Sequence, residues 1–343
     1  MQKALTYDDV ILVPKYSEIR SRLEPDLTSY LGDVATLTLP IISAPMDTVT
    51  GHEMAVAMCD AGAMGIIHRY NTIDEQVEEF GKVPEDCVAG VAVGASGDYM
   101  ERVEALYAAG AEVFCIDVAH GHHVLVRDAL NILRDRYGNN IHIMAGNIAT
   151  GEAFNDLAEW GADSIRVGIG GGSICSTRLN TGHGVPNFSS IQSCFQVFGG
   201  NGGPALVADG GIRKTGDIVK ALAAGADFVM CGSMLAGTEE SPGEVIDSVD
   251  NIGRPQKVKR YRGMASREAQ NNWRGTSGAP EGISSSVEYK GPVTPFLSDM
   301  AGLIKSGLSY SGARNIRELR QKAEFITQST ASIQEGFTHI LNK

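Results

Sequence analysis

The sequence lacks the features of membrane, secreted and nucleic-acid-binding proteins. No apolar run approaches the roughly 20 residues that a membrane span needs. The first residues, MQKALTYDDV, contain no apolar stretch of the signal-peptide kind. Basic charge is also scarce, since the formal net charge is −12, whereas general nucleic-acid binding needs a basic face. We therefore expect a cytoplasmic protein that binds neither membrane nor nucleic acid, while backbone dipoles can still hold one small anion.

The sequence also lacks any CxxC pair among its six cysteines. This absence argues against a zinc site and against a thioredoxin-like redox pair. Four cysteines lie in apolar runs or predicted helices, where cysteine usually acts as a small buried hydrophobic residue. Cys175 differs from them because glycine, serine and threonine surround it in the run GIGGGSICSTR.

Eight short apolar runs alternate with helical stretches between residues 40 and 235. The runs are rich in β-branched or small residues, and most lack strict alternation, as expected for strands covered on both faces. They are residues 40–46, 63–69, 88–94, 113–120, 141–149, 164–170, 205–211 and 228–233. Pieces such as AAGADF, in which a helix ends in glycine before a strand, recur along the chain. This repeat predicts an α/β fold, the (β/α)8 TIM barrel.

A doubly wound open sheet is the main alternative fold. It would place phosphate-binding glycines after its first strand, whereas here they follow the sixth. Residues 236–310 break the strand–helix repeat: GTEESPGE predicts the start of a helix, and residues from about 255 to 290 predict a mobile flap without regular structure. Residues 313–343 return to helical spacing. We expect one catalytic domain over residues 1–343.

Polar and glycine residues gather where the predicted strands end. These residues are Asp47, His68, Asp117, Asn147, Gly170, Asp209 and Gly232. Each by itself is typical of a turn or a helix cap. Barrel enzymes build their active site at the carboxyl ends of the strands, so seven such residues on one face predict a site there.

Cys175 is the candidate nucleophile of this site. A cysteine attacks as its thiolate, which the N–H groups of a glycine-rich turn and the positive end of a following helix would favour. Ser176, Thr177 and Arg178 add further donors, although an incidental thiol in a turn is the simpler reading. Glycines in GIGGGS (168–173), ADGGI (208–212) and CGS (231–233) predict a phosphate cradle.

Four side chains are candidates for moving protons or holding sugar. Asp209 could accept both ribose hydroxyls, although a turn aspartate is the simpler reading. Thr177, Glu281 and Arg274 are candidates for proton transfer, the last two because a flap could carry them into the site on closure.

Several long strings resemble the IMP dehydrogenase/GMP reductase family. They include LTYDDVILVP (5–14), SAPMDTVT (43–50), GIGGGSICSTRLNTGHGVP (168–186) and YRGMAS (261–266), and the resemblance covers residues 5 to 315. It implies a (β/α)8 barrel, a homotetramer, a 6-oxopurine mononucleotide substrate (GMP or IMP), a nicotinamide cofactor and often a bound potassium ion.

The resemblance also implies roles for individual residues. Cys175 would attack purine C2, and Thr177 would assist proton transfer. The nucleotide would contact Ser173, Asp209, Gly210, Gly211, Gly232, Ser233, Tyr261, Gly263, Met264 and Ala265. The cofactor would contact Asp117, Ala119, His120, Asn147, Gly168 and Gly170. Carbonyls of Gly170, Gly172 and Cys175 would bind potassium, in a loop that Gly171, replacing the family's usual proline, is expected to loosen.

The predicted flap favours one of the family's two reactions. Dehydrogenases carry an Arg-Tyr pair on the flap and usually insert CBS modules in the barrel. This sequence has no CBS insert, its flap is short, and Arg274 is followed by Gly275. Glu281 matches a glutamate that works with the threonine near cysteine in reductases. We expect an NADPH-dependent GMP reductase; the alternatives are an NAD-dependent IMP dehydrogenase, which SAPMDTVT and TEESPGE resemble more, and a nucleotide-binding scaffold without turnover.

Overall fold

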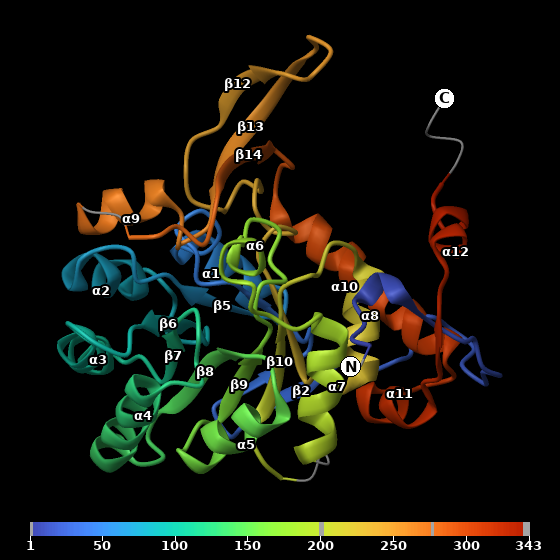
Figure 1. Ribbon diagram of the computed structural model, residues 1–343, viewed down its shortest axis with the longest axis horizontal. Coiled ribbons are helices and arrows are strands. Elements are labelled where there is room, and N and C mark those ends of the chain that lie inside the picture. Colours follow the sequence, from blue (N-terminus) through green and yellow to red (C-terminus); the bar gives the residue numbers. More distant parts are fainter. Residues whose placement is uncertain (1–2, 199–201, 276–277, 339–343) are drawn as a thin grey trace.

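Eight parallel strands close into a barrel at the centre of the molecule. The computed structural model describes residues 3–198, 202–275 and 278–338 (Figure 1). The barrel order is β10-β11-β4-β5-β6-β7-β8-β9. β11 pairs with β4, where Cys231 lies opposite Ser43, and the pairing of β9 with β10, where Val167 lies opposite Ala208, closes the barrel. Its strands are β4 (Ile41–Ser43), β5 (Met64–Ile67), β6 (Gly90–Val93), β7 (Val113–Asp117), β8 (His142–Ile148), β9 (Ser164–Val167), β10 (Ala205–Asp209) and β11 (Phe228–Cys231). Each lies within one of the eight predicted runs, so the predicted TIM barrel is confirmed.

Helices follow the barrel strands and cover their outer faces (Figure 1). They are α1 (His52–Asp60), α2 (Ile73–Gly81), α3 (Tyr99–Ala108), α4 (Val124–Tyr137), α5 (Gly151–Glu159), α7 (Asn187–Phe198), α8 (Thr215–Ala224) and α10 (Val293–Tyr310), whereas the short α6 (Thr177–Thr181) lies in the loop after β9. Three of them begin at side-chain caps, with Thr72, His123 and Thr150 accepting bonds from helical N–H groups. None of the helices in the described part of the chain combines the length and apolarity needed to cross a bilayer.

The strands are apolar on both faces because each face packs against a different layer. On β7, Val113 and Cys115 point into the barrel interior, whereas Phe114 and Ile116 pack against the surrounding helices. A hairpin of β2 (Ser29–Leu31) and β3 (Ala35–Leu37) joins the interior cluster through Leu31 and Leu37. The barrel is therefore a filled core, and its chemistry is confined to the loops at its carboxyl end.

The segment predicted to be a mobile flap without regular structure contains strands and a helix, so the prediction of irregular structure was wrong. It contains β13 (Pro255–Arg262), α9 (Arg267–Arg274) and β14 (Ser284–Glu288), and β12 (Ile246–Val249) precedes it. The three strands form an antiparallel sheet that projects from the barrel as a finger (Figure 1). Most of their residues are exposed, which is why the apolar pattern of a strand is missing from the sequence.

Two expectations for shorter segments were also wrong. GTEESPGE forms turns and no helix, since the buried Lys259 ammonium donates to the carbonyls of Thr238 and Glu239 at 3.1 Å and so holds them in a turn. The C-terminal segment has helices α11 (Ile316–Lys322) and α12 (Thr330–Glu335), but β15 (Phe325–Thr327) separates them and pairs with β1 (Val10–Leu12), which follows the short 3-10 helix η1 (Tyr7–Asp9). Residues 339–343 of the predicted helical segment lie outside the described residues.

The cysteines follow the expectation in part. Cys115, Cys194 and Cys231 are free and buried, as predicted. Cys59, expected to be a small buried hydrophobic residue, instead forms a disulfide bond with Cys87. The bond joins the end of α1 to the segment before β6, a contact that widely separated cysteines cannot reveal from their spacing.

Candidate active site

A cavity of about 530 Å³ opens at the carboxyl ends of the barrel strands. It is lined by Cys175, Thr177 and Glu281, by all ten residues expected to contact the nucleotide, and by five of the six expected at the cofactor. The sixth, His120, is exposed and does not line it. Arg274 ends α9, and its side chain lies outside the described part of the structure.

The Cys175 loop follows β9 and depends on glycine for its path. A Cβ at Gly168, whose φ is +151°, would lie 1.8 Å from the Asp209 carbonyl oxygen. A Cβ at Gly171 would lie 2.5 Å from Asn187 Oδ1. The Asn187 amide donates to the carbonyls of Asp209 and Gly210 at 2.8 and 2.6 Å, so it joins this loop to the next one. The replacement of proline by Gly171 thus makes room for Asn187, and the expected loosening of the loop does not follow from it.

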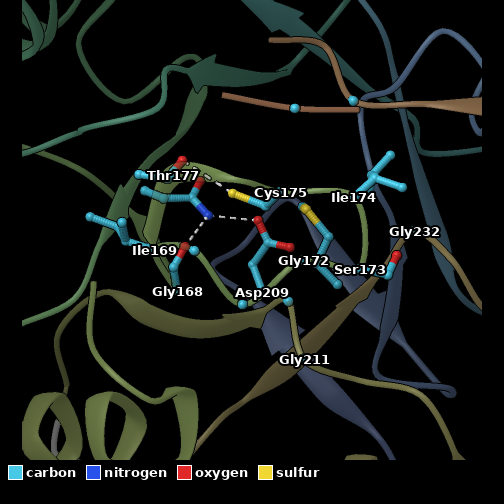
Figure 2. Close-up of a pocket in the computed structure, with 18 of the residues that line it drawn as sticks. Gly168, Ile169, Gly172, Ser173, Ile174, Cys175, Thr177, Asp209, Gly211 and Gly232 are labelled. Carbon is cyan, nitrogen blue, oxygen red and sulfur yellow. Dashed lines mark hydrogen bonds between the residues drawn. The ribbon is translucent and has the colours of Figure 1, made fainter. Parts of the chain in front are cut away.

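Cys175 begins a chain of hydrogen bonds that ends on the finger segment. Its Sγ lies 3.1 Å from Thr177 Oγ1 (Figure 2), and this hydroxyl donates to Glu281 Oε2 at 2.8 Å. The Ser176 N–H also donates to the Glu281 carbonyl at 2.8 Å, so the backbone fixes the carboxylate beside the loop. A thiol, a hydroxyl and a carboxylate in sequence can pass a proton between the nucleophile and a reacting group.

Backbone groups and hydroxyls line the deep end of the cavity. Gly211 has a φ of +75°, and Gly232 lies against Tyr261, whose hydroxyl a Cβ would approach to 3.4 Å. The Tyr261 hydroxyl lies 3.2 Å from Ser173 Oγ, and burial raises the pKa of this phenol. Neutral hydroxyls and glycine N–H groups from three loops form the kind of cradle that binds a phosphate.

The strand-end residues Asp47 and His68 do not line this cavity. Asp47 Oδ2 accepts from Arg262 Nε at 2.9 Å, which fixes the end of β13 beside the loop after β4. His68 Nδ1 accepts from the Tyr70 N–H at 3.2 Å, and burial lowers the pKa of its imidazole. Both residues therefore support neighbouring segments of the site.

Arg166, Arg69 and Asn187 are among the cavity residues that the sequence did not reveal. Arg166 is almost fully buried and binds two carboxylates; its signal was a basic residue inside the apolar run SIRVGIG. Arg69 donates to the Asp117 carbonyl at 3.1 Å, and Asn187 joins the Cys175 loop to the loop after β10. The roles of Arg69 and Asn187 arise from contacts between distant loops, for which the sequence carries no signal.

The finger helix docks on the barrel through an aromatic contact. The rings of Trp273, on α9, and Tyr70 lie 5.8 Å apart, and the Arg102 guanidinium lies 5.6 Å from the Trp273 ring centre. Figure 1 accordingly shows α9 beside α2. Because Tyr70 also lines the cavity, this contact joins the finger to the wall of the site.

Comparisons with known proteins cover almost the whole chain. A family model described as IMP dehydrogenase / GMP reductase domain matches residues 4–339. Inosine-5'-monophosphate dehydrogenase from Nitrosopumilus maritimus is 33% identical, covering 98% of each chain, and GMP reductase from Leishmania major is 30% identical, covering 100% of this chain and 98% of the relative. The crystal structure of a cysteine-to-alanine variant of GMP reductase from Trypanosoma brucei, in complex with guanosine 5'-monophosphate, superposes with a TM-score of 0.91 at 31% identity, covering 99% of this chain and 98% of that one.

Proposed function

Because the chain belongs to the IMP dehydrogenase/GMP reductase family of purine oxidoreductases, we propose that it is a GMP reductase. The reaction is GMP + NADPH + 2 H⁺ → IMP + NH₄⁺ + NADP⁺, carried out by a homotetramer in the cytoplasm. The observation that carries the proposal is the chain from Cys175 through Thr177 to Glu281. It offers both a nucleophile for purine C2 and a proton for the departing amine.

Cys175 acts first in the proposed mechanism. Its proton passes to Thr177 and Glu281, and the thiolate forms a bond to C2 of GMP. The same two residues return a proton to the amino group, which leaves C2 as ammonia while the sulfur stays bound. The reduced nicotinamide, when bound, supplies a hydride to C2. The carbon–sulfur bond then breaks, its electrons return to Cys175, and IMP is released.

The remaining lining residues hold the nucleotide. Gly211, Gly232, Ser233 and the hydroxyls of Ser173 and Tyr261 would bind the phosphate. The rest of the nucleotide would contact Asp209, Gly210, Gly263, Met264 and Ala265. Asp209 would accept from the ribose hydroxyls, and the backbone at Gly263 and Met264 would meet the base. These residues come from loops, from the end of β10 and from β13, and all of them line one cavity, in keeping with a single mononucleotide.

The cavity offers residues for the nicotinamide cofactor, whereas the proposed mechanism assigns no step to potassium. Asp117, whose carboxylate lines the cavity, would receive the nicotinamide, with Ala119, Asn147, Gly168 and Gly170 beside it. Potassium would be held by carbonyls of Gly170, Gly172 and Cys175. Since Arg178 already binds the neighbouring Ile169 carbonyl at 3.1 Å, the loop is held by protein groups, and we assign the ion no step.

An IMP dehydrogenase is the second candidate function, favoured by Arg274 on α9 and by the similar identity of relatives with that name. Two absorbance assays separate the two. GMP with NADPH should consume reduced cofactor, whereas IMP with NAD should produce it only in a dehydrogenase. Activity in the second assay alone would overturn our proposal. Cys175→Ala should abolish turnover and keep nucleotide binding, and silence of the unsubstituted chain in both assays would indicate a binding scaffold.

A further inference from the structure

The guanidinium of Arg166 lies between two carboxylates from different parts of the site. Arg166 is 6% exposed, and its Nη1 donates to Asp117 Oδ1 at 2.6 Å. Its Nη2 donates to Asp209 Oδ2 at 2.9 Å. All three side chains line the cavity. One buried cation therefore binds the carboxylate proposed to meet the cofactor and the carboxylate proposed to meet the ribose.

The backbone leaves room for this bridge. β8 lies between β7 and β9, where Gly146 pairs with Asp117 on one side and with Arg166 on the other. A Cβ at Gly146 would lie 2.6 Å from the Cβ of Arg166. Glycine at this position therefore lets the arginine side chain pass across β8 towards Asp117.

The charges of the three groups depend on one another. Burial alone favours a neutral Arg166, but the neighbouring Cys115, Asp209 and Asp117 raise the pKa of the guanidinium, so it stays protonated. A carboxylate that is largely removed from water is costly without a partner. Removal of the guanidinium would leave both Asp117 and Asp209 without the cation that orders them.

Each carboxylate keeps one oxygen open to a ligand. Asp209 Oδ2 accepts from both Arg166 and Asn147, whereas Oδ1 accepts no hydrogen bond from the described residues. Asp117 Oδ1 accepts from Arg166, and Oδ2 likewise has no donor in the described ranges. The open oxygens can accept a ribose hydroxyl on one side and an amide N–H on the other.

We propose that Arg166 is a positioning residue that couples nucleotide binding to cofactor binding. The proposal rests on the proposed function, which places the ribose at Asp209 and the nicotinamide at Asp117. A nucleotide that holds Asp209 also orders the guanidinium, and with it Asp117. The cofactor then binds to an Asp117 side chain that the nucleotide has already ordered, so it loses less conformational entropy on binding. The two ligands therefore bind cooperatively.

Lysine cannot replace arginine in this role. The guanidinium presents separate nitrogens in a fixed plane, one for each carboxylate, whereas lysine offers a single ammonium on a flexible stem. Arg166→Lys therefore keeps the charge but loses the simultaneous bridge. Asp117→Asn is a second, milder change, since it leaves Arg166 paired with Asp209.

The coupling can be measured by calorimetry in a Cys175→Ala background, where both ligands bind without turnover. We expect NADPH to tighten GMP binding about 5-fold or more, in the usual range of such couplings. The measured ratio is the affinity for GMP with NADPH present divided by the affinity for GMP alone. In Arg166→Lys and in Asp117→Asn this ratio should fall below about 2-fold, while the affinity for GMP alone should stay within about 3-fold of the background. Arg134→Lys is the matched control, because Arg134 also bridges a carboxylate and carbonyls, on the side of β8 away from the cavity.

The possible outcomes separate this inference from the proposed function. If both Arg166→Lys and Asp117→Asn keep the full ratio, or if Arg134→Lys loses it equally, the coupling role is wrong. If Arg166→Lys does not fold, as judged by circular dichroism, the folded Asp117→Asn variant decides. If the background binds IMP with NAD in place of GMP with NADPH, the proposed reaction fails, and the same ratio measured with that pair still tests Arg166.

Discussion

Replacing Thr177 by valine should abolish most of the catalytic rate and should change the stability of the protein little. Valine has the shape of threonine without the hydroxyl, so the substitution opens no cavity in the Cys175 loop. It removes the atom that lies 3.1 Å from Cys175 Sγ and donates to Glu281 at 2.8 Å. Within the described residues, Thr177 Oγ1 is the group that links Glu281 to the sulfur, so the path between the two is broken.

The expected size of the rate loss follows from what a positioned acid or base contributes to a reaction. A positioned acid or base contributes about 10²- to 10⁴-fold to a rate, which corresponds to roughly 3–5 kcal/mol of transition-state stabilisation. The loss should appear in kcat, because Thr177 stands beside the reacting sulfur and outside the phosphate cradle. The KM for the nucleotide should change little.

Steady-state kinetics with GMP and NADPH test this, with Thr177→Ser as the matched control. Serine retains the hydroxyl and should recover most of the rate. A valine variant within about 10-fold of the unsubstituted rate would show that Thr177 carries no obligatory proton, since general acid–base catalysis is worth more than that. An equal loss of rate in the serine and valine variants would show that the shape of the loop matters and not the hydroxyl. It would likewise refute the proposed proton transfer through Thr177.

Two further predictions concern stability. The Cys59–Cys87 bond spans 28 residues, and loop-closure entropy gives it about 3.6 kcal/mol; Cys59→Ser should therefore lower the melting temperature under non-reducing conditions, and an unchanged value there would show that the bond does not form. Burial lowers the pKa of His142 to about 4, so the unfolded chain binds a proton between about pH 6.5 and 4 that the folded chain does not. Stability should thus fall as the pH is lowered across this window, by at most about 3.4 kcal/mol from this residue, and His142→Gln should flatten the decline in denaturant titrations.

The barrel could be predicted from sequence because its strands obey a simple rule. A strand packed on both faces must be apolar along its length, so runs such as VFCIDV stand out between the helices. Their order also placed Asp117, Asn147 and Asp209 at one end, since parallel strands share a carboxyl edge. The site residues on these strand ends therefore followed from the fold without any knowledge of their contacts.

The finger and the disulfide could not be predicted in the same way. β13 and β14 pair with each other while most of their side chains face water, so their sequences carry the composition of a loop. Cys59 and Cys87 meet because α1 and the segment before β6 lie side by side in the folded barrel. Both features depend on distant contacts, which local patterns do not record.

The Cys175 loop shows why a departure from a family pattern needs its surroundings to be interpreted. Gly171 alone suggests a looser loop than the usual proline would give. In the structure the missing side chain is matched by Asn187, whose amide binds the carbonyls of Asp209 and Gly210. A proline at 171 would overlap Asn187, so the two residues form one arrangement, in which the Cys175 loop is fixed to the loop that begins at Asp209. Rigidity that proline would supply locally is supplied here by a contact between two loops.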